Sequence, residues 1–327
     1  MSFEFRGDAI IRSDDPSLEI IEAAPTIDAE LDLRLADPLS IRASLIAESV
    51  FRSGPFQDRL VGDIGDIGAK AETLFVEYAT GALTLYAGKI NPPFGVGWDL
   101  TPGLYGTDFA EDYELTERIG FGGSVSLGGE GIGVHVLGAS AFFLDTSVLS
   151  QSLIEDKGGV ERSDGGPSNT GDPASFALTL DGGKLPGLPG LSYHAAISRQ
   201  EGGRGAVADE AGYAFALHGE FPLGDGARLA PIVEIVRQVN DEAGPDDVTY
   251  VTAGVALLGG PWSLALSGTM RATDATGGPD TDDSLLQVSV GYAFGNGLSF
   301  ELGYKATEVD SVDSDVVGAL IAYEIEF

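Results

Sequence analysis

The chain has 327 residues, with 51 Asp plus Glu against 18 Lys plus Arg and no cysteine, which gives a formal net charge of −33 at pH 7. This charge excludes a nucleic-acid binder that works through its own basic surface, and the absence of cysteine excludes a disulfide scaffold, a Cys-ligated zinc site and thiol catalysis. Because 43% of the residues are apolar and the mean hydropathy is +0.10, the chain is not a disordered acidic polymer.

Apolar and polar side chains alternate with a period of two residues along the whole chain. In Ile27–Leu35 every odd position is apolar and every even position is charged. A strand with this pattern has one face for hydrocarbon and one for water. Similar segments predict sixteen strands, in chain order 2–13, 26–36, 40–51, 70–79, 82–90, 116–127, 131–143, 174–181, 189–199, 211–221, 227–238, 247–258, 261–271, 283–294, 297–307 and 316–327.

The lengths of the strands and of their connections indicate an all-β transmembrane barrel. Most of the predicted strands have 9 to 13 residues, as tilted membrane-spanning strands do, whereas the apolar runs are too short for a transmembrane helix. Short turns alternate with long loops, and the long ones are 14–25, 52–69, 91–115, 144–173, 200–210, 239–246, 272–282 and 308–315. An even number of antiparallel strands with short periplasmic turns and long outer loops predicts one outer-membrane barrel domain over residues 1–327.

The outer loops are acidic. Segments 239–247, 272–284 and 308–315 contain twelve acids and no base. Weak Ca²⁺ or Mg²⁺ binding at such acids is plausible on charge alone, but no dedicated metal or cofactor site is expected. The Asp- and Gly-rich stretch 163–172 lacks the ligand spacing of an EF-hand, and we interpret it as a flexible loop.

Two segments carry a resemblance to known proteins. The last strand ends on Phe327 and resembles the C-terminal strand of Gram-negative outer-membrane proteins, whose terminal Phe is read by the barrel-assembly machinery. Ala87–Gly95 (AGKINPPFG) resembles the strand-to-loop segment of porins in the phosphate- and polyphosphate-selective group. The resemblance implies an outer-membrane location in a Gram-negative bacterium, lipid and lipopolysaccharide as neighbours, and a homotrimer by analogy. The chain lacks the surplus of Lys and Arg for that group's basic lumen.

The water-facing sides of the predicted strands carry many charges. In a soluble sandwich one of the two faces would be a dry core, where unpaired charges are costly, whereas a sixteen-stranded barrel encloses water. The residues that we expect on the lumen wall include Asp28, Glu30, Asp32, Arg271, Glu301 and Lys305.

Loop 91–115 is apolar and aromatic, and it carries five acids with no base. We expect it to fold into the lumen, where it would act like the third long loop of general porins, which is their constriction loop. The alternative is a solvated external loop. Opposed acids and arginines would produce a transverse field that selects solutes by size and charge. The predicted constriction consists of Asp99, Asp108, Glu111 and Asp112 on the loop, facing Arg34, Arg42 and Arg118.

Three histidines leave little room for a catalytic site, and we expect no enzymatic activity. The sequence predicts a porin for passive diffusion of small hydrophilic solutes with a preference for cations. An outer-membrane barrel plugged by its loops, with a structural or surface-interaction role, remains the alternative. A soluble β-rich carbohydrate binder conflicts with the charged faces.

Overall fold

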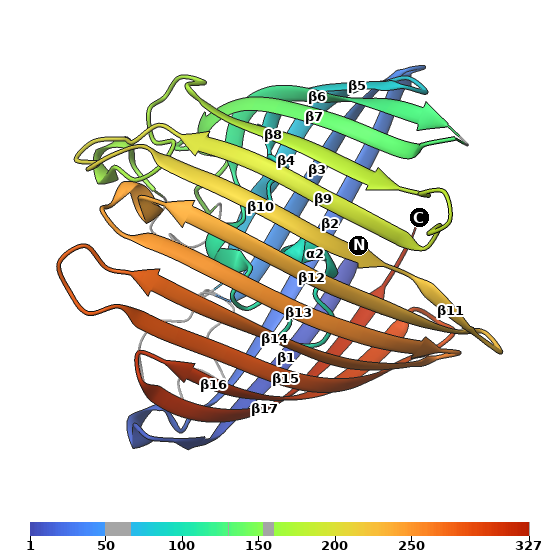
Figure 1. Ribbon diagram of the computed structural model, residues 1–327, viewed down its shortest axis with the longest axis vertical. Coiled ribbons are helices and arrows are strands. Elements are labelled where there is room, and N and C mark those ends of the chain that lie inside the picture. Colours follow the sequence, from blue (N-terminus) through green and yellow to red (C-terminus); the bar gives the residue numbers. More distant parts are fainter. Residues whose placement is uncertain (50–66, 130, 153–159, 327) are drawn as a thin grey trace.

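The computed structural model describes residues 1–49, 67–129, 131–152 and 160–326. Strands make up most of the described chain (Figure 1). The strands are β1 Ser2–Ser13, β2 Ile21–Ala36, β3 Leu39–Ser49, β4 Ile67–Ala79, β5 Leu83–Ile90, β6 Arg118–Gly129, β7 Gly133–Leu144, β8 Ser175–Gly183, β9 Leu191–Gln200, β10 Glu210–Gly219, β11 Phe221–Gly224, β12 Ala227–Val239, β13 Asp247–Gly259, β14 Trp262–Asp274, β15 Thr281–Ala293, β16 Leu298–Val309 and β17 Val312–Glu324.

Short helical turns occur in the connections, and no helix among the described residues is long and apolar enough to cross a bilayer. One of these turns, α2, follows β5 inside the connection to β6. The helical turns are η1 Pro16–Leu18, α2 Gly97–Leu100, η3 Glu111–Tyr113, η4 Arg162–Asp164 and η5 Asp241–Ala243.

The strands form one closed antiparallel sheet. Each strand pairs with its neighbours in sequence, and β1 pairs with both β2 and β17, which closes the barrel. Within the described chain, sixteen strands make the circuit, and the short β11 extends the line of β10 along β12. Closure leaves each of the sixteen circuit strands paired on both edges, as a strand in hydrocarbon requires. The predicted all-β antiparallel barrel is confirmed. The predicted long loop 308–315 is wrong, because β16 continues to Val309 and β17 begins at Val312, which leaves a two-residue turn.

The two faces of the wall differ as the alternation predicts. Leu31 on β2, Val233 on β12 and Leu266 on β14 are about half exposed on the outer face, whereas Glu234 and Ala265, next to two of them, are buried inside. At the short-turn end, the rings of Trp262, Tyr292 and Phe294 meet edge to face, with 4.7 Å between successive centroids. An apolar belt with aromatic residues near its rim suits a bilayer.

Some predicted strand limits are wrong by several residues. β2 begins at Ile21 rather than at residue 26, because its ladder with β1 continues to the pair Ala9 and Ile21. The predicted strand 211–221 is interrupted at Glu220, whose backbone N–H donates to Gly190 O in the neighbouring turn. The start of the predicted loop 52–69 and Phe327 lie outside the described residues.

Candidate functional site

Loop 91–115 lies against the inner wall. Side chains from β1, β9, β12, β14, β15 and β16 form hydrogen bonds to it. A segment can reach the inward faces of strands spread around a closed barrel only from within the barrel. Figure 1 shows its short helix α2 within the outline of the barrel. The loop therefore narrows the interior on the side of β9–β16.

Glu234 on β12 anchors both ends of this loop. Its carboxylate accepts hydrogen bonds from the backbone N–H of Val96 at 2.7 Å and of Gly97 at 2.9 Å. It also accepts one from the Tyr113 hydroxyl at 2.6 Å. A Cβ added at Gly97 would lie 2.5 Å from this carboxylate, so the contact requires glycine there. Three donors satisfy a carboxylate that is only 1% exposed.

Tyr105 fixes the middle of the loop to the wall between β1, β16 and β17. Its hydroxyl donates to Asp8 Oδ1 at 2.7 Å. The ring lies over a gap left by two glycines, since a Cβ at Gly318 would be 2.1 Å from the hydroxyl and one at Gly303 would be 3.1 Å from the ring. Lys305 Nζ lies 4.6 Å from the ring centroid, a distance typical of a cation–π contact.

The loop carboxylates Asp108 and Asp112 are paired with bases of the adjacent wall. Lys305 Nζ donates to Asp108 at 2.6 Å, and Arg6 lies 3.8 Å from the same carboxylate. Arg271 donates to Asp112 at 2.9 Å and to Asp283 on β15 at 2.6 Å. These pairs attach the loop to the wall and neutralise the wall's bases at the same time.

The three arginines that the sequence analysis places opposite the loop lie elsewhere. Arg34 is exposed near the short-turn end and pairs with Asp37 at 3.5 Å. Arg42 pairs with Glu77 at 2.9 Å and lies 3.7 Å from Asp32. Among the described residues, no ion pair joins these two arginines to loop 91–115. Arg118 is buried and donates to Gln200 at 3.2 Å and to Thr116 O at 2.6 Å.

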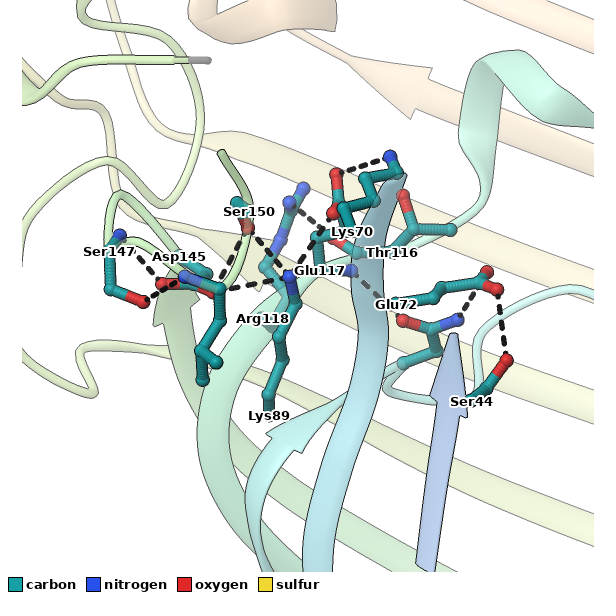
Figure 2. A network of polar contacts seen from close by, with 12 residues as sticks. Ser44, Lys70, Glu72, Lys89, Thr116, Glu117, Arg118, Asp145, Ser147 and Ser150 are labelled. Carbon is teal, nitrogen blue, oxygen red and sulfur yellow. Dashed lines mark hydrogen bonds and ion pairs between the residues drawn. The ribbon is translucent and has the colours of Figure 1, made fainter. Parts of the chain in front are cut away.

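A buried ionic network lies where loop 91–115 leaves and rejoins the barrel wall (Figure 2). Lys89, at the end of β5, has a side chain that is 0% exposed and lies 3.1 Å from Glu117 and 3.2 Å from Asp145. Its ammonium also donates to Ser150 at 2.7 Å. Lys70 on β4 binds the second oxygen of Glu117 at 3.1 Å. The Lys89 of the AGKINPPFG segment is therefore a structural cation and does not face the lumen water.

The acids on the remaining part of the loop lie close to other acids. Burial, together with the charges of Asp99, Glu72 and Glu111, raises the pKa of Glu114 to about 7. Burial and the charge of Asp108 raise the pKa of Glu111. Because Glu72 is on β4, acids of the loop and of the facing wall act on the same space. This part of the interior has a strongly negative potential.

The expected lumen-wall residues differ in their contacts. Asp28, Glu30 and Asp32 alternate along β2 with the exposed apolar side chains of Leu31 and Leu33, and their place on the lumen wall stays a prediction. Glu301 on β16 accepts a hydrogen bond from Ser289 at 2.5 Å, and Lys305 and Arg271 contact the loop as described above. Among the described residues, no group of three or more His, Asp or Glu side chains is arranged to hold a metal ion.

Sequence reasoning missed the residues that attach the loop. Neither the predicted constriction nor the named lumen-wall residues include Glu234, Asp8 or Tyr105. The alternation shows which face of the wall a residue occupies, but it does not indicate which loop residue that wall residue contacts. The glycines at 303 and 318, on the inward faces of neighbouring strands, are the one local hint, because an inward glycine admits close approach.

No protein-family model and no curated protein matches the chain. Solved structures of similar fold include Pseudomonas putida OprB, with a TM-score of 0.68 and 11% identity over 98% of this chain and 92% of that one. A loop-deletion mutant of OmpT, an outer membrane protein of Vibrio cholerae, gives 0.57 and 15% over 98% of each chain. Pseudomonas aeruginosa OpdK with vanillate gives 0.53 and 12% over 98% of this chain and 97% of that one.

These likenesses show a shared fold. The chain has the closed antiparallel β-barrel fold of these porins. Its apolar outer belt and the pairing of the sixteen circuit strands on both edges suit a barrel that spans a membrane.

Proposed function

We propose that the protein is a channel for passive diffusion of small hydrophilic solutes and that it prefers cations. The observation that carries this proposal is that loop 91–115, which is attached to the inner wall, brings five acids and no base into the interior. Burial and the charges of Asp99 and Glu72 accordingly raise the pKa of Glu114 to about 7. Nearby bases are already engaged, because Arg271 and Lys305 bind loop carboxylates and Lys89 is buried. A region with this balance concentrates cations and depletes anions.

We therefore expect neutralisation of Asp99, Glu111 and Glu114, to Asn, Gln and Gln, to move the reversal potential in a KCl gradient toward that of a non-selective pore. The shift is larger at low ionic strength, where screening is weak. A matched control neutralises Asp282, Glu308 and Asp313 near the outer loops, which changes the net charge equally. An unchanged reversal potential in the first variant, or equal shifts in both, would show that loop 91–115 does not set the selectivity.

Selectivity should also depend on pH through Glu114. A carboxyl with a pKa of about 7 is ionised above that pH and neutral below it. Lowering the pH from about 8 to about 6 therefore removes one negative charge from the interior and reduces the preference for cations. Glu114→Gln should reduce this step in the reversal potential.

The matched control for the pH experiment is Asp241→Asn in η5. Burial and the charge of Glu210 raise the pKa of Asp241 to about 7 as well, but this residue belongs to an outer connection. The step should persist in Asp241→Asn. If the step is lost in Asp241→Asn and kept in Glu114→Gln, the pH-sensitive charge lies in the connection between β12 and β13.

Single-channel recording in a planar bilayer tests the proposal as a whole. Open-channel steps that scale with salt support a pore. A folded barrel that passes no current would favour the alternative, a barrel plugged by its loops with a structural or surface-interaction role. We propose no enzymatic role, because His194 is engaged by Asp181 and by Phe94 O rather than by a nucleophile.

We also infer partners from the class of protein. Outer-membrane lipid and lipopolysaccharide would surround the belt, and recognition by the barrel-assembly machinery would involve Phe327, which lies outside the described residues. A homotrimer remains a proposal by analogy with other porins. Cross-linking in native membranes measures the oligomeric state.

A further inference from the structure

His194 lies beneath the first residues of the loop. It is on the inward face of β9 and is only 2% exposed. Its Nδ1 is 2.7 Å from Asp181 Oδ1 on β8. Its Nε2 is 2.7 Å from the backbone carbonyl oxygen of Phe94. The imidazole therefore joins the barrel wall to loop 91–115 through both of its nitrogen atoms.

Both partners of this ring can only accept hydrogen bonds. A carboxylate and a carbonyl oxygen have no proton to donate, whereas a neutral imidazole has a single N–H. Both contacts are hydrogen bonds only when both nitrogens carry a proton, that is, when His194 is an imidazolium cation. In the neutral ring one nitrogen lone pair would face an oxygen at 2.7 Å, which is repulsive.

The surroundings of His194 stabilise a cation. The strand register places Asp181 directly beside His194, followed by Ala216 on β10 and Glu234 on β12. Ala216 is fully buried between the two charged residues. His218, also on β10, is the remaining titratable group near the ring. Two carboxylates therefore flank the imidazolium, and Glu234 holds the neighbouring backbone of the loop.

We propose that His194 is a positioning residue whose protonation state sets how firmly loop 91–115 is attached. The imidazolium holds Phe94 while Glu234 holds the next turn. Loss of one proton to the lumen water leaves a neutral ring that donates to Asp181, the stronger acceptor. The bond to the Phe94 carbonyl is then lost, and the start of the loop is released. The consequence for conduction rests on the proposed function, but the attachment itself does not.

The two tryptophans of the chain make the attachment measurable without current. Trp98 lies on α2, four residues after Phe94, and is 38% exposed. Trp262 lies on the outer belt. In a Trp262→Phe parent, quenching of Trp98 by acrylamide reports the access of water-soluble molecules to the loop. We expect weak quenching at low pH and a rise through a single one-proton step between about pH 5 and about pH 9, around the histidine range.

Two substitutions in this parent should remove the step in opposite ways. His194→Gln removes the titrating group, so quenching should be independent of pH and at the high level. Asp181→Asn supplies an N–H donor to Nδ1, so that a neutral ring can accept there and still donate from Nε2 to Phe94. Its quenching should be independent of pH and at the low level. His218→Gln should keep the step.

A step that survives in His194→Gln, or a parent without any step, would overturn the proposal. High quenching at all pH values in Asp181→Asn would also contradict the proposal. Asparagine is polar and has the same shape as aspartate, so this variant tests the proposal even where His194→Gln does not fold. Quenching reports the accessibility of Trp98 on the loop and does not depend on the current through the channel. It therefore tests this proposal separately from the proposed selectivity. A step in quenching together with an unchanged reversal potential in the Asp99, Glu111 and Glu114 variant would contradict only the selectivity.

Discussion

Replacement of Lys89 by methionine is expected to lower the free energy of unfolding by about 3–5 kcal/mol, the usual cost of removing one partner from a buried ionic network. The Lys89 side chain is 0% exposed, as is that of Asp145, which lies 3.2 Å from it. Methionine has a similar length but leaves Asp145 without its buried counter-ion. Unfolding from lipid vesicles in urea, followed by the gel shift of the folded barrel, measures the loss.

Two controls separate the buried charge from the rest of the network. Lys70→Met removes a partly exposed partner of Glu117 and should cost only about 0–1 kcal/mol. Adding Asp145→Asn to Lys89→Met should restore part of the stability, because the amide has no charge left to compensate. Equal losses of unfolding free energy in Lys89→Met and Lys70→Met would show that the burial of the Lys89 ammonium has no effect on stability.

The barrel could be predicted because its physical cause is local. A strand between lipid and water must alternate, as Ile27–Leu35 does, and closure needs an even number of such strands with turns at alternate ends. The limits of strands were harder to predict. β2 extends to Ile21 because its partner β1 continues to pair with it as far as Ala9, and the amino-acid pattern of Ile21–Pro25 does not alternate in the same way.

The attachment of loop 91–115 could not be predicted in the same way. Asp108 and Lys305 are 197 residues apart in sequence and 2.6 Å apart in space. Alternation places both Lys305 and Arg34 on the wet face. It does not show how far along the barrel axis each base lies, nor which strands the loop contacts. Arg118, which is predicted to face the loop, is buried instead, and its guanidinium donates to Gln200 and to Thr116 O.

A pair of neighbouring substitutions on β2 tests most sharply which side chains of the strand face the bilayer and which face the interior. Leu31→Arg is expected to destabilise the barrel by about 2–4 kcal/mol, the cost of a basic side chain near the bilayer midplane. Leu31 is 56% exposed on the outer face, so arginine there would lie in hydrocarbon. Glu30→Arg introduces the same side chain one residue earlier, on the face toward the water-filled interior.

Glu30→Arg should be nearly neutral for stability, because arginine at this position would join Asp28 and Asp32, which occupy the same face of β2. Both variants are unfolded from vesicles of the same lipid, since the penalty at Leu31 depends on the thickness of the hydrocarbon. It should shrink in shorter-chain lipids, where the guanidinium reaches water more easily. Equal stability of the two variants in every lipid would mean that the apolar face of β2 does not contact the bilayer, and the outward belt would then have to be a protein interface.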